Sequence, residues 1–247
     1  MCTLSFAPGK SGYFAAMNRD ERLTRVPALP PQMFRSGDLL AVYPHEPEGG
    51  TWIASNERGI TLALLNWNLR GGQSVMDNRS SRGSIIPHLI TQHDVVDVTQ
   101  KLNTLSLQGI LPFRLVGIFW RERELYEWRW NGAALTRVSF PWRPGHWFSS
   151  GISDAMAGRA RREHSRLAWQ DANAGTLPWL RELHRSHGPR PGAFGICVHR
   201  NDAATISYSE VIYAPGTLTF NYSAGQPCKN HPLLTLDIPL VQPGVVA

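Results

Sequence analysis

The sequence predicts an α+β protein in which one domain, residues 1–247, forms a four-layer αββα sandwich of two mainly antiparallel sheets between helix layers. Groups of short apolar segments alternate along the chain with segments of helical periodicity. Tight turns join neighbouring strand segments, which favours antiparallel pairing. Hydrophobic residues make up 42% of the chain and charged residues 18%, so 247 residues can bury one substantial core.

The N-terminal part of the chain is predicted to form strands. They are expected at 3–7, 13–17, 51–55 and 60–65. A Pro-Gly turn separates the first two, and Asn56-Glu57-Arg58-Gly59 separates the last two, so each pair should form a hairpin. A proline-rich connector with Pro27, Pro30 and Pro31 lies between the hairpins, and a polar loop is expected at 68–81.

Helices and further strands alternate through the rest of the chain. Helices are expected at 84–92, 95–105, 159–172 and 179–187, and Asp94 is placed to cap the second. Strands are expected at 113–121, 124–130, 135–140, 193–199, 205–213, 217–222 and 233–238. Paired helices between groups of strands indicate helical layers on the outside of the sheets.

The charge of the chain does not indicate a nucleic-acid-binding protein. The formal net charge is +6, but the basic residues are scattered and all except Lys10, Lys101 and Lys229 are arginines. No recognised nucleic-acid-binding motif accompanies them. No apolar run could span a bilayer, and the N-terminus lacks a signal-peptide pattern, so a cytoplasmic protein without stable membrane insertion is expected.

The cysteine and histidine patterns predict neither a disulfide framework nor a metal site. Cys2, Cys197 and Cys228 are an odd number without close spacing, which argues against thiolate-rich zinc binding. Cys197 reads as a small core residue, and Cys228 has no partner that the sequence identifies. The motif HExxH is absent, and His184 and His187 are interpreted as exposed helix residues. No metal or other cofactor is therefore expected.

Cys2 is a candidate N-terminal nucleophile. Cysteine is small enough for the initiator methionine to be removed, which would give Cys2 a free α-amine. Such an amine has a pKa of about 7.7–8.0, so near neutral pH it can accept the proton of the thiol. The alternative is that a cysteine at the second position is incidental.

The polar tetrapeptide Asn18-Arg19-Asp20-Glu21 strengthens this interpretation. If 3–7 and 13–17 form a hairpin, the tetrapeptide returns beside Cys2. Aspartate could orient the amine, arginine could lower the thiol pKa or bind a substrate carboxylate, and asparagine could donate to an oxyanion. The alternative is a charged surface turn.

The chain resembles the NRDE family, which includes the transport-and-Golgi-organisation proteins. The resemblance rests on Met1-Cys2, the block at 15–21, Gly49-Gly50-Thr51-Trp52, Asn56-Glu57-Arg58-Gly59, Leu64-Leu65-Asn66-Trp67, Ser81-Arg82-Gly83 and the block at 151–155. The Gly-Gly-Thr-Trp block could also be a substrate loop, but a turn followed by a strand with a core tryptophan is the favoured interpretation.

The resemblance implies an N-terminal nucleophile hydrolase fold, more remotely similar to bile-salt hydrolases and penicillin V acylases. It implies Cys2 as the nucleophile, Asp20 with Arg19 or Asn18 as the polar group that orients it, and Asn66 as an oxyanion donor. Arg200 is the nearest candidate for a late arginine of the remoter relatives. The expected partner is a small molecule: an acyl amide or related acyl compound for an enzyme, or acyl-CoA, lipid or haem for a non-catalytic carrier.

Three arginines at helical spacing suggest a possible phosphate contact, as in coenzyme A. They are Arg159, Arg162 and Arg166, with Arg161 beside them. The favoured alternative is a solvated helix face on which Glu163 compensates part of the charge.

Overall fold

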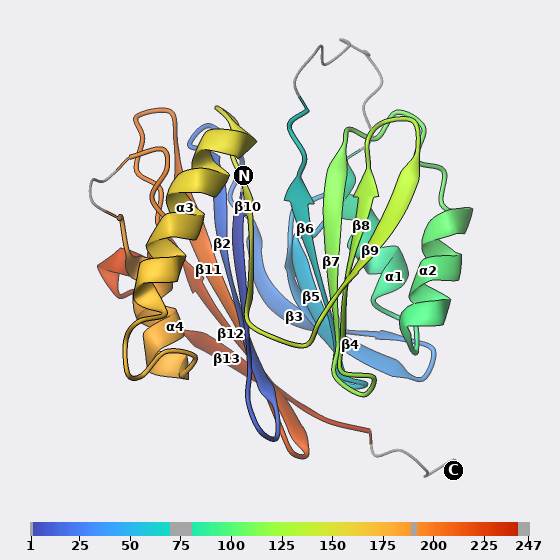
Figure 1. The fold of residues 1–247 in the computed structure, drawn as a ribbon. Coiled ribbons are helices and arrows are strands. Elements are labelled where there is room, and N and C mark those ends of the chain that lie inside the picture. Colours follow the sequence, from blue (N-terminus) through green and yellow to red (C-terminus); the bar gives the residue numbers. More distant parts are fainter. Residues whose placement is uncertain (1, 70–80, 189–191, 242–247) are drawn as a thin grey trace.

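Two antiparallel sheets pack face to face between two layers of helices (Figure 1). The structure is a computed structural model and describes residues 2–69, 81–188 and 192–241. Most of the polar loop expected at 68–81 therefore lies outside the described residues. No helix of the described segments is long and apolar enough to cross a membrane.

The first sheet, which carries Cys2, has six strands in the order β10-β1-β2-β11-β12-β13. Their bounds are β1 Cys2–Pro8, β2 Tyr13–Arg22, β10 Gly145–Ser149, β11 Ala203–Ala214, β12 Thr217–Ala224 and β13 Leu234–Pro239. Strand β1 is thus an interior strand, flanked by β10 and β2. This position fixes the start of the chain by backbone pairing on both sides.

The second sheet has seven strands in chain order. They are β3 Leu29–Ser36, β4 Leu39–His45, β5 Ile53–Asn56, β6 Ile60–Asn66, β7 Phe113–Phe119, β8 Glu124–Trp130 and β9 Leu135–Phe140. Apolar side chains of both sheets, among them Leu4, Met17, Ile53 and Val116, form one core between them.

Each sheet has its own helical layer. Helices α1 (Ile85–Leu89) and α2 (Val95–Thr104) cover the second sheet, and α3 (Asp154–Ala168) and α4 (Leu177–Arg185) cover the first (Figure 1). Asp94 caps α2, because its carboxylate accepts the backbone N–H of Asp97 at 2.9 Å. Two short 3₁₀ helices, η1 (Arg82–Ser84) and η2 (Pro227–Lys229), complete the fold.

The predicted fold class is confirmed, but several elements differ from the sequence prediction. The tetrapeptide 18–21 lies inside β2 rather than in a turn. The proline-rich connector is partly the edge strand β3, where missing backbone donors do no harm. Strands β4 and β10 were not predicted. Helix α3 begins at Asp154, after the cap Ser153, rather than at 159.

Residues 193–199 do not form the predicted strand. This segment consists of bends and turns with one isolated bridge, His199 to Ala204. Its backbone groups bond to a loop residue and to a side chain instead of to a neighbouring strand: the N–H of Cys197 donates to Ser186 O at 2.8 Å, and Ile196 O accepts from the Asn18 side chain. The apolar character of this segment reflects burial under α4 rather than strand pairing.

Candidate active site

The hairpin of β1 and β2 places Cys2 beside the polar tetrapeptide. In the strand register Cys2 lies opposite Arg19 on one side and opposite Ser149 on the other. The backbone nitrogen of Cys2 donates to Ser149 Oγ at 2.9 Å. This nitrogen becomes the α-amine if Met1 is removed, so Ser149 holds the atom that the N-terminal nucleophile hypothesis requires as the base.

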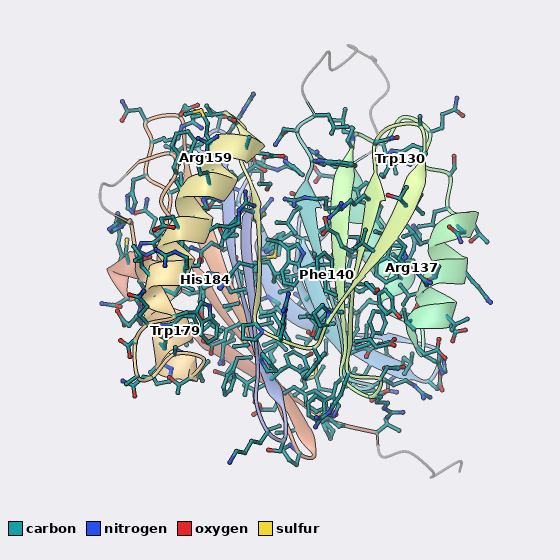
Figure 2. The ribbon with its side chains drawn as sticks, in the orientation of Figure 1. Trp130, Arg137, Phe140, Arg159, Trp179 and His184 are labelled. Carbon is teal, nitrogen blue, oxygen red and sulfur yellow. The ribbon has the colours of Figure 1, made fainter. Side chains whose placement is uncertain are left out.

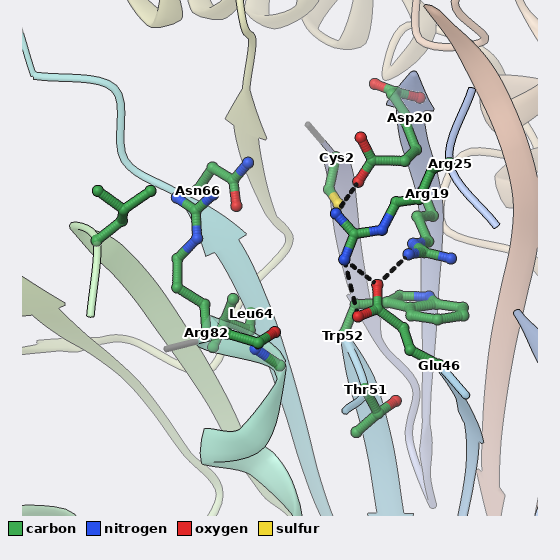
Figure 3. Close-up of a pocket in the computed structure, with 14 residues that line it drawn as sticks. Cys2, Arg19, Asp20, Arg25, Glu46, Thr51, Trp52, Leu64, Asn66 and Arg82 are labelled. Atoms are coloured by element: carbon green, nitrogen blue, oxygen red, sulfur yellow. Dashed lines mark hydrogen bonds and ion pairs between the residues drawn. The ribbon is translucent and has the colours of Figure 1, made fainter. Parts of the chain in front are cut away.

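A pocket of about 280 Å³ lies at Cys2, between the ends of the two sheets (Figure 3). Its lining comprises Cys2, Arg19, Asp20, Glu21, Arg25, Glu46, Thr51, Trp52, Leu64, Asn66, Ser81, Arg82, Gly83 and Leu111. Of the sequence-predicted site residues, it brings together Cys2, Arg19, Asp20 and Asn66. Arg200 is not among the lining residues and pairs with Asp202 at 2.6 Å.

Arg19 is fixed in the pocket by an acidic and an aromatic partner. Its guanidinium pairs with Glu46 at 2.5 Å and stacks on the Trp52 ring at 4.0 Å from the centroid. Arg25 also pairs with Glu46, at 2.7 Å. Sequence reasoning missed Glu46 and Arg25 as pocket residues, because both belong to segments without a predicted element.

The thiol of Cys2 is buried among groups that act on its pKa in opposite directions. Burial raises the pKa of Cys2, and the carboxylate of Asp20 adds to this, whereas the positive charge of Arg19 and a hydrogen bond from the backbone N–H of Asp20 lower it. Cys2 is only 6% exposed, but the pocket gives a small molecule access to it. A proton acceptor close to the sulfur is therefore needed for nucleophilic attack.

Although Asp20 is among the residues that line the pocket, its carboxylate lies on the helix side of the sheet, where it meets Arg161 of α3. Its carboxylate accepts from Thr205 Oγ1 at 2.6 Å and pairs with Arg161 Nη2 at 3.4 Å, and both side chains of the ion pair are fully buried. Burial raises the pKa of Asp20, and the charge of Arg161 opposes this shift. The carboxylate thus shapes the electrostatics around Cys2 from the helix side of the sheet.

Arg161 also holds the first strand. Its Nη1 donates to Thr3 Oγ1 at 2.9 Å, to Ser149 O at 3.3 Å and to Cys2 O at 3.4 Å. The sequence prediction considered its neighbours Arg159, Arg162 and Arg166 instead, and these three are exposed. The signal for Arg161 is its spacing from Ala157 and Ser165, which places it on the face of α3 that packs on the sheet.

Asn18 does not face the pocket. Its side-chain amide donates to His184 O and Ile196 O, both at 2.9 Å, and its Oδ1 accepts from His184 Nδ1 at 3.0 Å. The amide is therefore fully used in joining β2 to α4 and to the segment before β11, and we do not retain Asn18 as an oxyanion donor. His184, which was expected to be exposed, is completely buried in the helical layer (Figure 2).

A directed hydrogen-bond chain links two neutral imidazoles, the half-buried His146 and the fully buried His184. Trp169 Nε1 can only donate, and it donates to His146 Nε2 at 3.0 Å. His146 Nδ1 then donates to Ser5 Oγ at 2.8 Å, Ser5 donates to His184 Nε2 at 2.9 Å, and His184 Nδ1 donates to Asn18. Burial lowers the pKa of His184 to about 3.

We expect the protein to lose stability as the pH falls below 6.5, because His184 binds a proton in the unfolded chain but not in the folded one. The loss continues down to the folded pKa of about 3 and amounts to about 2 kcal/mol at pH 5. Urea unfolding at pH 7 and pH 5 measures it. His184→Gln should show a smaller difference between the two pH values than the unsubstituted protein, and an equal difference would contradict the assignment.

Asn66 ends β6 on the opposite sheet and lies across the pocket from Cys2 (Figure 3). The blocks Gly49-Gly50-Thr51-Trp52 and Ser81-Arg82-Gly83 meet at the same pocket. The N–H of Thr51 donates to Gly83 O at 3.0 Å, and a Cβ on Gly50 would lie 3.2 Å from the Gly83 backbone. Glycine therefore fits this close approach best. The next residue but one, Trp52, lines the pocket, and its ring packs in the core.

The fold is shared with solved structures of amide-hydrolysing N-terminal nucleophile hydrolases. Penicillin V acylase from Agrobacterium tumefaciens superposes with a TM-score of 0.58 at 8% identity, covering 96% of this chain and 86% of that one. The N-acylethanolamine-hydrolyzing acid amidase ortholog of Caenorhabditis elegans gives 0.59 at 11% identity, covering 85% and 92%.

A variant of conjugated bile acid hydrolase from Clostridium perfringens gives a TM-score of 0.51 at 10% identity, covering 100% of both chains. At these identities the likeness shows the fold alone. The family model described as Transport and Golgi organisation 2 matches residues 1–164, and the chain belongs to that family. No curated protein sequence matches the chain.

Proposed function

We propose that the protein is an N-terminal cysteine hydrolase that cleaves a small non-peptide amide or a related acyl compound. The observation that carries this proposal is the joint placement of the Cys2 thiol and the Cys2 nitrogen at one pocket. The nitrogen donates a hydrogen bond to Ser149 Oγ, and the sulfur accepts a hydrogen bond from the backbone N–H of Asp20. Arg19 and Asn66 line the same space.

In the proposed reaction the neutral α-amine of Cys2 takes the thiol proton, and the thiolate attacks the carbonyl carbon of the substrate. Asn66 Nδ2 and a backbone N–H donate to the oxyanion of the tetrahedral intermediate. The ammonium then returns its proton to the leaving amine as the C–N bond breaks. Water attacks the thioester in turn, which releases the carboxylic acid and regenerates the thiol.

The second candidate, a non-catalytic carrier of acyl-CoA, lipid or haem, has less support. Charged side chains of Arg19, Arg25 and Glu46 line the pocket, whereas lipid and haem pockets are predominantly apolar. The described cavity of about 280 Å³ also suits a small acyl group better than such large ligands. Binding of these ligands without chemistry at Cys2 would favour the carrier.

Arg19→Gln should raise the pKa of the Cys2 thiol further, because it removes a positive charge that lowers this pKa. The rate at which iodoacetamide alkylates Cys2, followed by peptide mass against pH, measures the change. We expect the midpoint to move to higher pH, because the thiolate loses a nearby positive charge. Arg166→Gln, on the exposed face of α3, is the matched control. Equal midpoints for the two variants would contradict the role of Arg19.

A further inference from the structure

A second cluster of nucleophilic side chains lies apart from the pocket. It consists of His187, Cys197, His199 and Cys228, whose ligand-type atoms all lie within 4.8 Å of one another. His199 Nε2 is 2.9 Å from His187 Nε2, 3.4 Å from Cys228 Sγ and 3.6 Å from Cys197 Sγ. None of the four residues lines the pocket at Cys2.

These separations bracket those of a tetrahedral zinc site, so small shifts of the four side chains would bring all of them to bonding distance of one ion. Zn–N bonds of about 2.0–2.1 Å and Zn–S bonds of about 2.3 Å place the ligand atoms of a tetrahedron about 3.3–3.8 Å apart. Two imidazoles and two thiols are also a ligand set that selects zinc. Both cysteines are free of disulfides, so both sulfurs are available.

The local backbone brings the four ligands together from three segments. His187 follows the end of α4, and the N–H of Cys197 donates to Ser186 O at 2.8 Å. A Cβ on Gly195 would lie 2.8 Å from His187 O, so glycine is what allows this close approach. The 3₁₀ helix η2 then carries Cys228 to His199.

Gln226 supplies the hydrogen bond that a metal-binding histidine needs on its other nitrogen. Its side-chain amide lies 3.2 Å from His199 Nδ1, and among the described residues its buried Oε1 has no hydrogen-bond partner. The oxygen and nitrogen of an amide are assigned by hydrogen bonding, and exchanging them lets Oε1 accept from Nδ1–H. This tautomer leaves the lone pair of His199 Nε2 directed at the other three ligands.

We propose that His187, Cys197, His199 and Cys228 bind one Zn²⁺ as a closed structural site. Binding releases the two thiol protons to solvent, and the two thiolates neutralise the charge of the ion. Four protein ligands leave no position for a substrate, so the site stabilises rather than catalyses. The proposal does not depend on the hydrolase function, and it departs from the sequence expectation of no metal.

The site would hold the segment that supports the hairpin of β1 and β2. Between Cys197 and His199, the N–H of Val198 donates to Thr205 Oγ1 at 2.8 Å, and this hydroxyl donates to Asp20. Ile196 O accepts from Asn18. Zinc at the cluster would thus fix the backbone of Ile196, which bonds to Asn18, and of Val198, which bonds to Asp20 through Thr205. Sequence reasoning missed the cluster because its spacings match no short zinc motif.

Metal analysis of untagged protein, purified without metal-affinity resin and then equilibrated with zinc and desalted, tests the proposal. We expect about one zinc ion per chain, falling below about 0.2 in Cys228→Ser and His187→Ala. The matched controls are His231→Ala and Cys2→Ala, because His231 and Cys2 lie outside the cluster. Both variants should retain the metal. Less than about 0.2 zinc in the folded unsubstituted protein, or a Cys197–Cys228 disulfide in place of metal, would overturn the proposal.

Two further measurements use the unsubstituted protein, so they test the zinc site even if one variant fails to fold. Cobalt-substituted protein should show the visible absorption of tetrahedral Co²⁺ bound to thiolate, and excess zinc should abolish it. Removing zinc with a chelator should lower the midpoint of thermal unfolding by at least about 5 °C, reversibly on zinc addition. An octahedral cobalt spectrum or an unchanged midpoint would contradict a structural zinc site.

Discussion

Cys2→Ala is expected to lower kcat/KM for amide hydrolysis by at least about 10³-fold, because it removes the nucleophile on which every later step depends. The fold should survive, since the change deletes one sulfur atom at a pocket and leaves the backbone bond from the Cys2 nitrogen to Ser149 Oγ available. A panel of fluorogenic N-acyl amides with increasing acyl length supplies the substrate. Circular dichroism and thermal unfolding check the fold.

Cys2→Ser tests whether the thiol itself is needed, or only a side chain of this size with a nucleophilic oxygen or sulfur. A serine hydroxyl can occupy the same place but ionises far less readily than a thiol, so turnover should also fall steeply. Turnover comparable to that of the unsubstituted protein in Cys2→Ala, with the same amide, would remove the basis for the proposed mechanism.

Arg161→Met is expected to lower the free energy of unfolding by about 3–5 kcal/mol, because it leaves the buried carboxylate of Asp20 without its ion-pair partner. It also removes the donor to Thr3 Oγ1, Ser149 O and Cys2 O, which together fix the start of β1. Urea unfolding measures the change. Arg162→Met, one residue along on the exposed face of α3, should stay within about 0.5 kcal/mol.

A double-mutant cycle with Asp20→Asn isolates the pair. Neutralising both partners removes the unpaired charge, so Asp20→Asn/Arg161→Met should be less destabilised than the sum of the two single variants. Strict additivity, with a coupling energy below about 0.5 kcal/mol, would show that Arg161 does not act through Asp20.

The hairpin that brings the tetrapeptide to Cys2 could be predicted from local sequence, because a Pro-Gly turn between two apolar segments determines which residues meet. The register confirms this, with Cys2 opposite Arg19. The alternation of side chains along β2 explains why the prediction of Asn18 as an oxyanion donor was wrong. Successive side chains of a strand point to opposite faces, so Asn18 and Asp20 face the helices while Arg19 faces the pocket.

Residues that depend on packing between distant segments could not be predicted. Arg161 and His184 read as solvated helix residues, yet both are buried because their helices lie on the sheet that holds Cys2. Glu46 enters the site only because the second sheet brings the end of β4 to Arg19. Each is a charged or polar group whose partner lies far away in the sequence. A local pattern can mark the buried face of a helix, as it does for Arg161, but it does not identify the partner.

Intact-mass analysis of the protein during incubation with an N-acyl amide tests the central claim most directly. We predict a chain lacking Met1 and a transient adduct with the mass of the acyl group, located at Cys2 by peptide mapping and absent in Cys2→Ala. A chain that keeps Met1, or amide turnover without an acyl group ever appearing on Cys2, would contradict it.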